Sequence, residues 1–172
     1  MSDLLDPPLG SGDHVDGPPD APLELVMYGD FQCPFCSAAR PILRRVRDRL
    51  DGRLRFAFRH FPLTELHPDA QRAAEASEAA AAQGAFWPMH DALYGAGGVL
   101  GLEVVIGLAA GLGLDAERVR TELADGTHAE RVAADVGSGR AAGVAGTPTF
   151  FVNGERHRGH YDAQSLIAAL ER

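Results

Sequence analysis

The two cysteines of this chain are separated by only two residues, in the segment Cys33-Pro34-Phe35-Cys36, and the chain contains no others. They stand where an apolar run, Leu23 to Tyr28, gives way to the pattern of an amphipathic helix. A disulfide that closes so short a loop removes little conformational entropy from the unfolded chain, so it would stabilise a fold of 172 residues only weakly. The pair is suited instead to opening and closing as a redox couple.

The length of the chain is that of one domain, and a domain of this size buries roughly 70% of the surface that it exposes when unfolded. It therefore needs no structural disulfide or metal. The first residues show neither the basic and apolar segments of a signal peptide nor a run of ~20 apolar residues, so we expect a cytoplasmic protein that does not enter a membrane. Thiols stay largely reduced in the cytoplasm, which favours a catalytic or redox-sensing dithiol.

The charge of the chain argues against nucleic acid as a partner. The net charge is -8 at pH 7, and the basic residues are all arginines. Eight of these arginines lie between Arg40 and Arg59, where mixed charge is typical of a solvated helix face leading into a strand. We therefore expect no phosphate-binding surface.

The pattern along the first part of the chain predicts an arm followed by a strand-helix-strand unit. Residues 1–22 are broken by prolines and glycines, so we expect a flexible N-terminal arm, with the folded domain spanning 23–172. A buried strand is predicted over Leu23 to Tyr28, a helix over Pro34 to Leu50 and a second strand over Leu54 to Phe61. This order is a β-α-β unit.

The rest of the chain predicts an all-helical segment and a short β-rich ending. Residues from about 63 to 143 show helical periodicity and capping residues, so they are expected to form a helical insertion. Thr149 to Val152 is a strand candidate, and Asn153-Gly154 indicates a hairpin turn after it. A last helix is expected over Ala163 to Glu171, capped by Asp162.

The position of the cysteines at the start of a helix assigns a role to each. The unpaired N–H groups and the dipole of a helix N-terminus favour an anion, and the thiolate is the form of cysteine that attacks a disulfide. Cys33 is therefore predicted to be the exposed nucleophile, and Cys36, one turn along, the more buried resolving thiol. Phe31 and Phe35 are candidates for an apolar rim that contacts a protein partner, although both rings could equally lie in the core.

A second candidate site lies at Thr147-Pro148, at the mouth of the apolar strand that begins with Thr149. Proline cannot donate to a sheet ladder, and a cis bond before it would leave backbone groups of Thr147 facing outward, where an extended substrate could bind them. An edge-strand proline with the commoner trans bond is the alternative.

Taken together, these segments resemble the DsbA-type thiol-disulfide oxidoreductases of the thioredoxin fold. The resemblance rests on the stretch Tyr28 to Cys36, on Pro41, on Phe58 to Leu63, on the helical insertion and on Gly146 to Gly154. It implies an α/β fold of the thioredoxin type with an inserted all-helical subdomain.

The resemblance also implies roles. Cys33 would be the nucleophile, Cys36 the resolving cysteine, and Thr147-Pro148 a cis-proline pair that binds substrate together with Pro34 and Phe35. The protein would be a protein-disulfide oxidoreductase whose redox-active disulfide, Cys33–Cys36, replaces any cofactor. Its partners would be disulfide- or dithiol-containing proteins and a redox partner, and the chain is expected to be a monomer.

One residue departs from the family pattern. Many members place a buried acid six residues before the first cysteine, where it relays the proton of the resolving thiol, and Met27 stands there in this chain. Asp30 or His60, at the ends of the two flanking strands, or a water molecule is the expected replacement. An ordinary structural histidine is the competing interpretation of His60.

Other functions remain open from the sequence. Cys33, Cys36, His157 and His160 supply the ligand types of a zinc site, but only two residues separate the histidines, where Cys₂His₂ sites have three to five. We therefore expect no metal. The further alternatives are a non-catalytic peptide-binding module on the same fold and a glutathione-dependent isomerase, whose members generally lack the second cysteine.

Overall fold

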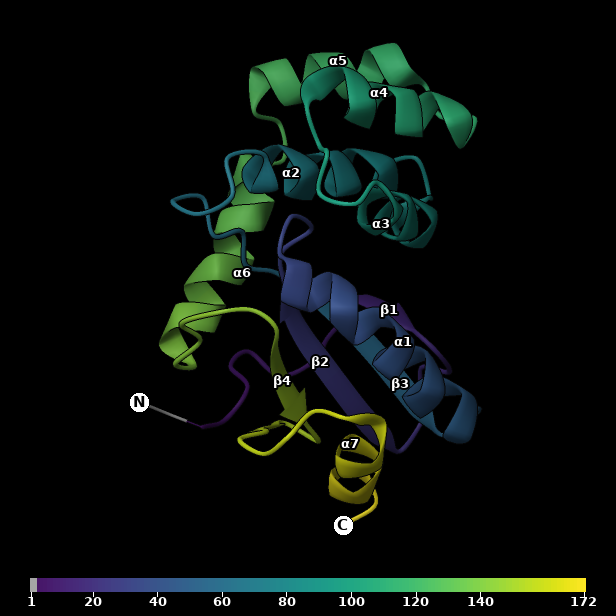
Figure 1. The fold of residues 1–172 in the computed structure, drawn as a ribbon, viewed down its shortest axis with the longest axis vertical. Helices are drawn as coiled ribbons and strands as arrows, with labels where there is room; N and C mark the ends of the chain where they lie inside the picture. Colours follow the sequence, from purple (N-terminus) through teal and green to yellow (C-terminus); the bar gives the residue numbers. More distant parts are fainter. Residues whose placement is uncertain (1–2) are drawn as a thin grey trace. The chain divides into compact units, whose positions relative to one another are not determined.

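The computed structural model describes residues 3–172, which form two compact units (Figure 1). One unit comprises residues up to 29, 38–59 and 137–172, and it contains the β-sheet. The other comprises 30–37 and 60–136, and it is mostly helical. In residues 3–172, every helix falls short of the length and apolar character that crossing a bilayer requires.

The first unit is built on a five-stranded sheet with the order β1-β3-β2-β4-β5 (Figure 1). The strands are β1 (His14–Asp16), β2 (Leu23–Gly29), β3 (Leu54–His60), β4 (Thr149–Val152) and β5 (Glu155–Arg156). β1 runs antiparallel to β3, β4 antiparallel to β2, and β5 antiparallel to β4. The predicted strands are therefore confirmed, within a residue or two at their ends.

The centre of the sheet is apolar because β2 and its neighbour β4 are buried along most of their length. Val26 of β2 lies opposite Phe151 of β4, and both are completely buried. Tyr28 packs edge-on against Phe151, with 5.7 Å between ring centroids. A strand buried in this way is expected to read as a continuous hydrophobic run, which is what the sequence shows there.

Helix α1 (Pro34–Arg49) connects β2 to β3 in the chain, and α7 (Ala163–Leu170) follows β5. Ala39, Val46 and Leu50 are buried, which is the apolar stripe predicted from the three- and four-residue spacing. The predicted cap of α7 is also present, since the Asp162 carboxylate accepts a hydrogen bond of 3.0 Å from the backbone N–H of Ser165.

The prediction that residues 1–22 lack regular structure is wrong for the part of this segment that the structure describes. Residues 14–16 form β1, which gives this proline-rich segment backbone hydrogen bonds to the sheet edge. The buried Arg59 guanidinium donates to the Asp13 carboxylate at 2.7 Å and 3.0 Å and to the Pro7 carbonyl at 2.9 Å. A buried charge needs such partners. Asp13, in the N-terminal segment, therefore provides the counterion of Arg59 on β3.

Besides the first residues of α1, the second unit contains four helices and the first part of a fifth. They are α2 (Ala70–Ala81), α3 (Phe86–Gly95), α4 (Leu102–Gly111), α5 (Ala116–Asp125) and α6 (Ala129–Ala141), whose last residues belong to the first unit. The small side chains of Ala73, Ala76 and Ala80 are completely buried on α2, which packs against α3, α4 and α5. The predicted bounds of the helical insertion, about 63 and 143, stay a prediction.

One ion cluster of this unit predicts a pH-dependent stability. Glu122 accepts hydrogen bonds of 2.7 Å from both Arg118 and His128. Burial by itself would raise the pKa of Glu122, but the bonds from His128 and Arg118 outweigh it and hold the pKa below its ordinary value of 4.5. The stabilisation from this carboxylate is therefore fully present above the unfolded pKa and is lost as the pH falls through the lower, folded pKa.

We expect Glu122→Gln to lower the free energy of unfolding at pH 7, and the difference from the unchanged chain to shrink as the pH is lowered below 4.5. Urea unfolding at a series of pH values measures this difference. Glu117→Gln, on the same helix with a side chain 81% exposed, is the control and should change little. A difference that stayed constant down to pH 2 would contradict the assignment.

Candidate active site

The dithiol segment connects the end of β2 to the start of α1. Cys33 directly precedes the first helical residue, and its carbonyl accepts the first hydrogen bond of the helix, 3.1 Å from the backbone N–H of Ser37. Cys36 is the third residue of the helix. The predicted placement at a helix N-terminus is therefore confirmed.

The exposure of the two cysteines differs from the expectation. Cys33 is only 3% exposed and Cys36 is completely buried, so the prediction of an exposed Cys33 is wrong. The segment before the helix forms a turn, in which the Cys33 backbone N–H donates to the carbonyl of Asp30 at 3.1 Å. The two residues between the cysteines are exposed instead, and Phe35 is 65% exposed.

The carboxylate of Asp30 holds this turn in place. It accepts hydrogen bonds from the backbone N–H of Gln32 at 2.7 Å, from the backbone N–H of Leu63 at 2.9 Å and from His67 Nδ1 at 2.7 Å. Asp30 is buried, so these donors replace the water that a carboxylate otherwise binds. His67 is thus part of the site.

The side chain of Gln32 forms hydrogen bonds between the same turn and other parts of the helical unit. Its amide nitrogen donates to the carbonyl of Gly98 at 3.0 Å, and its amide oxygen accepts from the backbone N–H of Asp69 at 2.8 Å. Asp69 directly precedes α2, and Gly98 lies between α3 and α4. The residue before Cys33 is therefore bound to two separate parts of the unit.

Phe31, in the same turn, belongs to an aromatic cluster. Phe31 is buried, which decides between the rim and the core in favour of the core. Its ring centroid lies 5.0 Å from that of Tyr94, 5.6 Å from that of His90 and 6.1 Å from that of His60. The Tyr94 hydroxyl donates to the carbonyl of Asp30 at 3.3 Å.

The side chain of Tyr94 is buried, and the charge of the dithiol affects its titration. Burial raises the pKa of Tyr94 well above its ordinary value of 10.0, and negative charge on Cys36, Asp30 and Cys33 adds to the effect. Sequence reasoning missed this residue, because nothing in the pattern of α3 distinguishes it from a core tyrosine.

His60 is completely buried, and both its ring and its backbone form hydrogen bonds. Its Nε2 lies 2.7 Å from Glu78 Oε1, and its backbone N–H donates to the Asp135 carboxylate at 2.8 Å. Glu78 is a buried carboxylate on α2 that the sequence analysis did not single out. A relay role for Asp30 or His60 stays a prediction.

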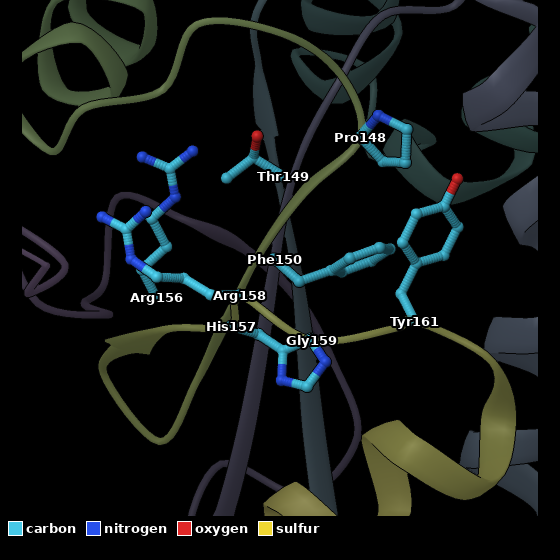
Figure 2. A pocket seen from close by; sticks show the side chains of 8 residues that line it. All are labelled: Pro148, Thr149, Phe150, Arg156, His157, Arg158, Gly159 and Tyr161. Carbon is cyan, nitrogen blue, oxygen red and sulfur yellow. The ribbon is translucent and has the colours of Figure 1, made fainter.

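Thr147 and Pro148 belong to the sheet unit, just before β4. Their peptide bond is cis. A pocket of about 230 Å³ opens beside Pro148, with the guanidinium groups of Arg156 and Arg158 on one side and the rings of Phe150 and Tyr161 on another (Figure 2).

Of the two histidines of the zinc alternative, His157 lines the same pocket. His157 Nε2 lies 2.7 Å from the backbone carbonyl oxygen of His160, so this ring nitrogen is already engaged within the loop. The absence of a metal stays a prediction.

Comparison with known proteins identifies the family. A family model described as thioredoxin matches residues 10–172, which is nearly the whole chain. This chain belongs to the thioredoxin family. The match begins inside the segment that was expected to be an arm, in agreement with the pairing of β1 in the sheet.

Solved structures of thioredoxin-fold proteins show which variant of the fold this is. BdbD from Bacillus subtilis has a TM-score of 0.88 and 23% identity, with 99% of this chain and 97% of BdbD covered. A thioredoxin-like oxidoreductase from Silicibacter pomeroyi has a TM-score of 0.81 and 28% identity, with 95% and 92% covered. Alpha-DsbA1 from Wolbachia pipientis has a TM-score of 0.80 and 20% identity, with 95% and 91% covered. The thioredoxin-family chain therefore has the DsbA-like fold that its sequence predicts.

The curated relatives of this thioredoxin-family chain are much longer. The Na⁺/H⁺ antiporter NhaA 1 of Salinispora arenicola is 48% identical over 168 residues, which is 98% of this chain and 26% of the antiporter. The chain thus spans about a quarter of the length of the curated relatives that it matches.

Proposed function

We propose that this chain is a thiol-disulfide oxidoreductase that works through Cys33 and Cys36. The observation that carries the proposal is the placement of both cysteines at the start of α1 in a DsbA-like fold. Unpaired backbone N–H groups and the helix dipole favour a thiolate at Cys33, which offsets part of the cost of burying an anion there.

The reaction is a sequence of two exchanges. The Cys33 thiolate attacks one sulfur of a partner disulfide, a mixed disulfide forms, and the other partner sulfur leaves as a thiolate. Cys36 then loses its proton and attacks the Cys33 sulfur, so that the Cys33–Cys36 disulfide forms and the second partner sulfur is released. The partner gains two electrons and the dithiol loses two. The same steps in reverse oxidise a partner dithiol, and no further cofactor is required.

Protein partners are proposed on the basis of the exposed residues of the motif. Pro34 and Phe35 present apolar surface beside the buried sulfurs, and exposed aromatic residues often mark a binding site. Thr147 and Pro148 are proposed to bind an extended segment of the substrate through their backbone groups, as the family resemblance implies. Asp30 or His60 is proposed to relay the proton of the resolving thiol.

The curated relatives suggest a setting for this dithiol. Because almost the whole chain matches part of an Na⁺/H⁺ antiporter, we propose that the dithiol acts alongside a membrane antiporter. We also propose that the chain is cytoplasmic and monomeric.

Equilibration in glutathione buffers tests the proposed function. We expect both thiols to disappear together as the buffer becomes more oxidising, because a two-electron couple converts the pair in one step. Alkylation followed by mass spectrometry counts the thiols at each ratio. The proposal fails if the two cysteines oxidise independently, or if both stay reduced at every ratio.

A further inference from the structure

The pocket beside Pro148 combines positive charge with aromatic surface (Figure 2). Its volume is about 230 Å³, and its lining comes from the sheet unit. Among the eight described residues that line it, two are arginines and none is acidic. The chain as a whole is acidic, with a net charge of -8, so the positive charge of this pocket is a local feature. It favours the binding of an anionic group.

Arg156 is held in a fixed position at this pocket. It lies on β5, it is half-buried, and its Nη1 donates a hydrogen bond of 2.6 Å to the carbonyl oxygen of Gly143. Its backbone N–H donates to the carbonyl oxygen of Asp3 at 2.7 Å. A carbonyl is a neutral acceptor, so these bonds orient the residue without cancelling its charge. A guanidinium has five N–H donors, and those that Gly143 does not use can bind a carboxylate.

Arg158 shows which kind of group this side of the pocket binds. Its guanidinium is paired with the carboxylate of Asp3, and this hydrogen bond holds the pKa of Asp3 below its ordinary value of 3.8. The N-terminal segment is kept there by backbone bonds, since the N–H of Leu5 donates to the carbonyl of Gly154 at 2.8 Å. Arg158 thus has a carboxylate partner within the chain, and Arg156 is the guanidinium that a ligand can use.

The aromatic residues of the pocket suit the apolar part of an acidic side chain. The ring centroids of Phe150 and Tyr161 lie 5.4 Å apart, with 46° between the ring planes. The methylene groups of a glutamate can pack on these rings while its carboxylate reaches Arg156. Burial of those methylene groups adds to the attraction between the charges, so the pocket favours a peptide side chain over an inorganic anion.

We propose that this pocket binds an acidic side chain of the protein substrate and that Arg156 is the residue that selects it. The inference rests on the proposed function and names its substrate class, which is a polypeptide with a glutamate or aspartate near the cysteine that Cys33 attacks. Pro148 borders the pocket, and its backbone is proposed to bind an extended segment of the substrate. The acidic side chain belongs to that same segment.

Pairs of short peptides test this selection. Each peptide carries one cysteine, joined by a disulfide to thionitrobenzoate, and the members of a pair differ only in having glutamate or glutamine at one position close to the cysteine, on either side. The Cys33 thiolate attacks the peptide sulfur, and thionitrobenzoate leaves with the bonding electrons, so its absorbance measures the rate. We expect the glutamate peptide to react about fivefold faster at one or more positions, which is the effect of a partly exposed ion pair.

Variants of Arg156 show whether the preference comes from this pocket. Arg156→Gln is expected to bring the ratio of the two rates close to one, because the side chain loses its charge. Arg156→Lys keeps the charge, so it should retain more of the preference even if the loss of the Gly143 contact loosens the hairpin. Arg45→Gln is the matched control. Arg45 is an exposed residue of α1 outside the pocket lining, so its substitution removes the same charge and should keep the ratio.

Equal rates for glutamate and glutamine peptides at every position overturn the inference, and so does a preference that Arg156→Gln leaves intact. A preference that Arg156→Gln and Arg45→Gln abolish equally is an effect of net charge, and it also overturns the role of the pocket. Failure of the proposed function gives a different result. In that case neither peptide releases thionitrobenzoate faster with the unsubstituted chain than with Cys33→Ser.

Discussion

Cys33→Ser is expected to reduce disulfide exchange to the rate measured without protein, whereas Cys36→Ser is expected to accumulate covalent complexes with partners. The difference follows from the roles proposed for the two sulfurs. Without Cys33 there is no attacking thiolate at the helix N-terminus, and without Cys36 the mixed disulfide forms but is not resolved from within.

The pair of serine variants provides its own control, because both remove one sulfur atom from the same turn of the chain. Non-reducing electrophoresis of each variant after incubation with an oxidised protein substrate shows the complexes directly, and adding dithiothreitol should release them. If Cys33→Ser kept full function, the chain would be a peptide-binding module that does not use its thiols. Equal trapping by both variants would remove the distinction between nucleophile and resolving cysteine.

Asp30→Ala is expected to lower the free energy of unfolding by about 3 to 5 kcal/mol. The substitution leaves two backbone donors, at Gln32 and Leu63, without their acceptor, and each buried donor left unsatisfied costs about 1 to 3 kcal/mol. It also removes the partner of His67. Urea unfolding followed by circular dichroism measures the loss.

Asp115→Ala is the matched control for this prediction. Asp115 caps α5 by accepting a 3.0 Å hydrogen bond from the backbone N–H of Arg118, but it lies at an exposed site. Loss of an N-cap costs about 1 kcal/mol. A loss from Asp30→Ala no larger than that of the control would show that the Asp30 carboxylate does not hold the turn.

Asp30→Asn separates the structural role of this residue from the proposed relay. The amide oxygen can still accept hydrogen bonds but the side chain cannot carry a proton at neutral pH. We expect smaller destabilisation than with alanine. A pH profile of mixed-disulfide resolution that matched the unchanged chain would remove Asp30 from the relay.

Most of the fold could be predicted because local patterns determine it. The buried run before Gly29, the helical spacing after Pro34 and the Asn153-Gly154 turn each depend on residues close together in the chain, and each corresponds to an observed element. The failure at residues 1–22 has the opposite cause. Prolines and glycines predict a break in regular structure, but they do not show that a distant strand edge and the buried Arg59 provide partners for that segment.

The candidate site divides in the same way. The cysteine spacing at a strand-to-helix junction is a local signal, so the dithiol could be found from the sequence. His67 and Tyr94 could not, because their places in the site depend on where the helical unit brings an imidazole and a hydroxyl relative to Asp30.

The sequence by itself determined the dithiol, its place at the start of a helix and the order of strands and helices around it, because these depend on spacing along the chain. Only the tertiary structure decided that Cys33 is buried, that three donors converge on the carboxylate of Asp30, and that the hydroxyl of Tyr94 lies against the carbonyl of Asp30. The physical reason is that burial and hydrogen bonding are set by groups that meet in space. The residues that surround Tyr94 on α3 contain no pattern that indicates its contact with the site.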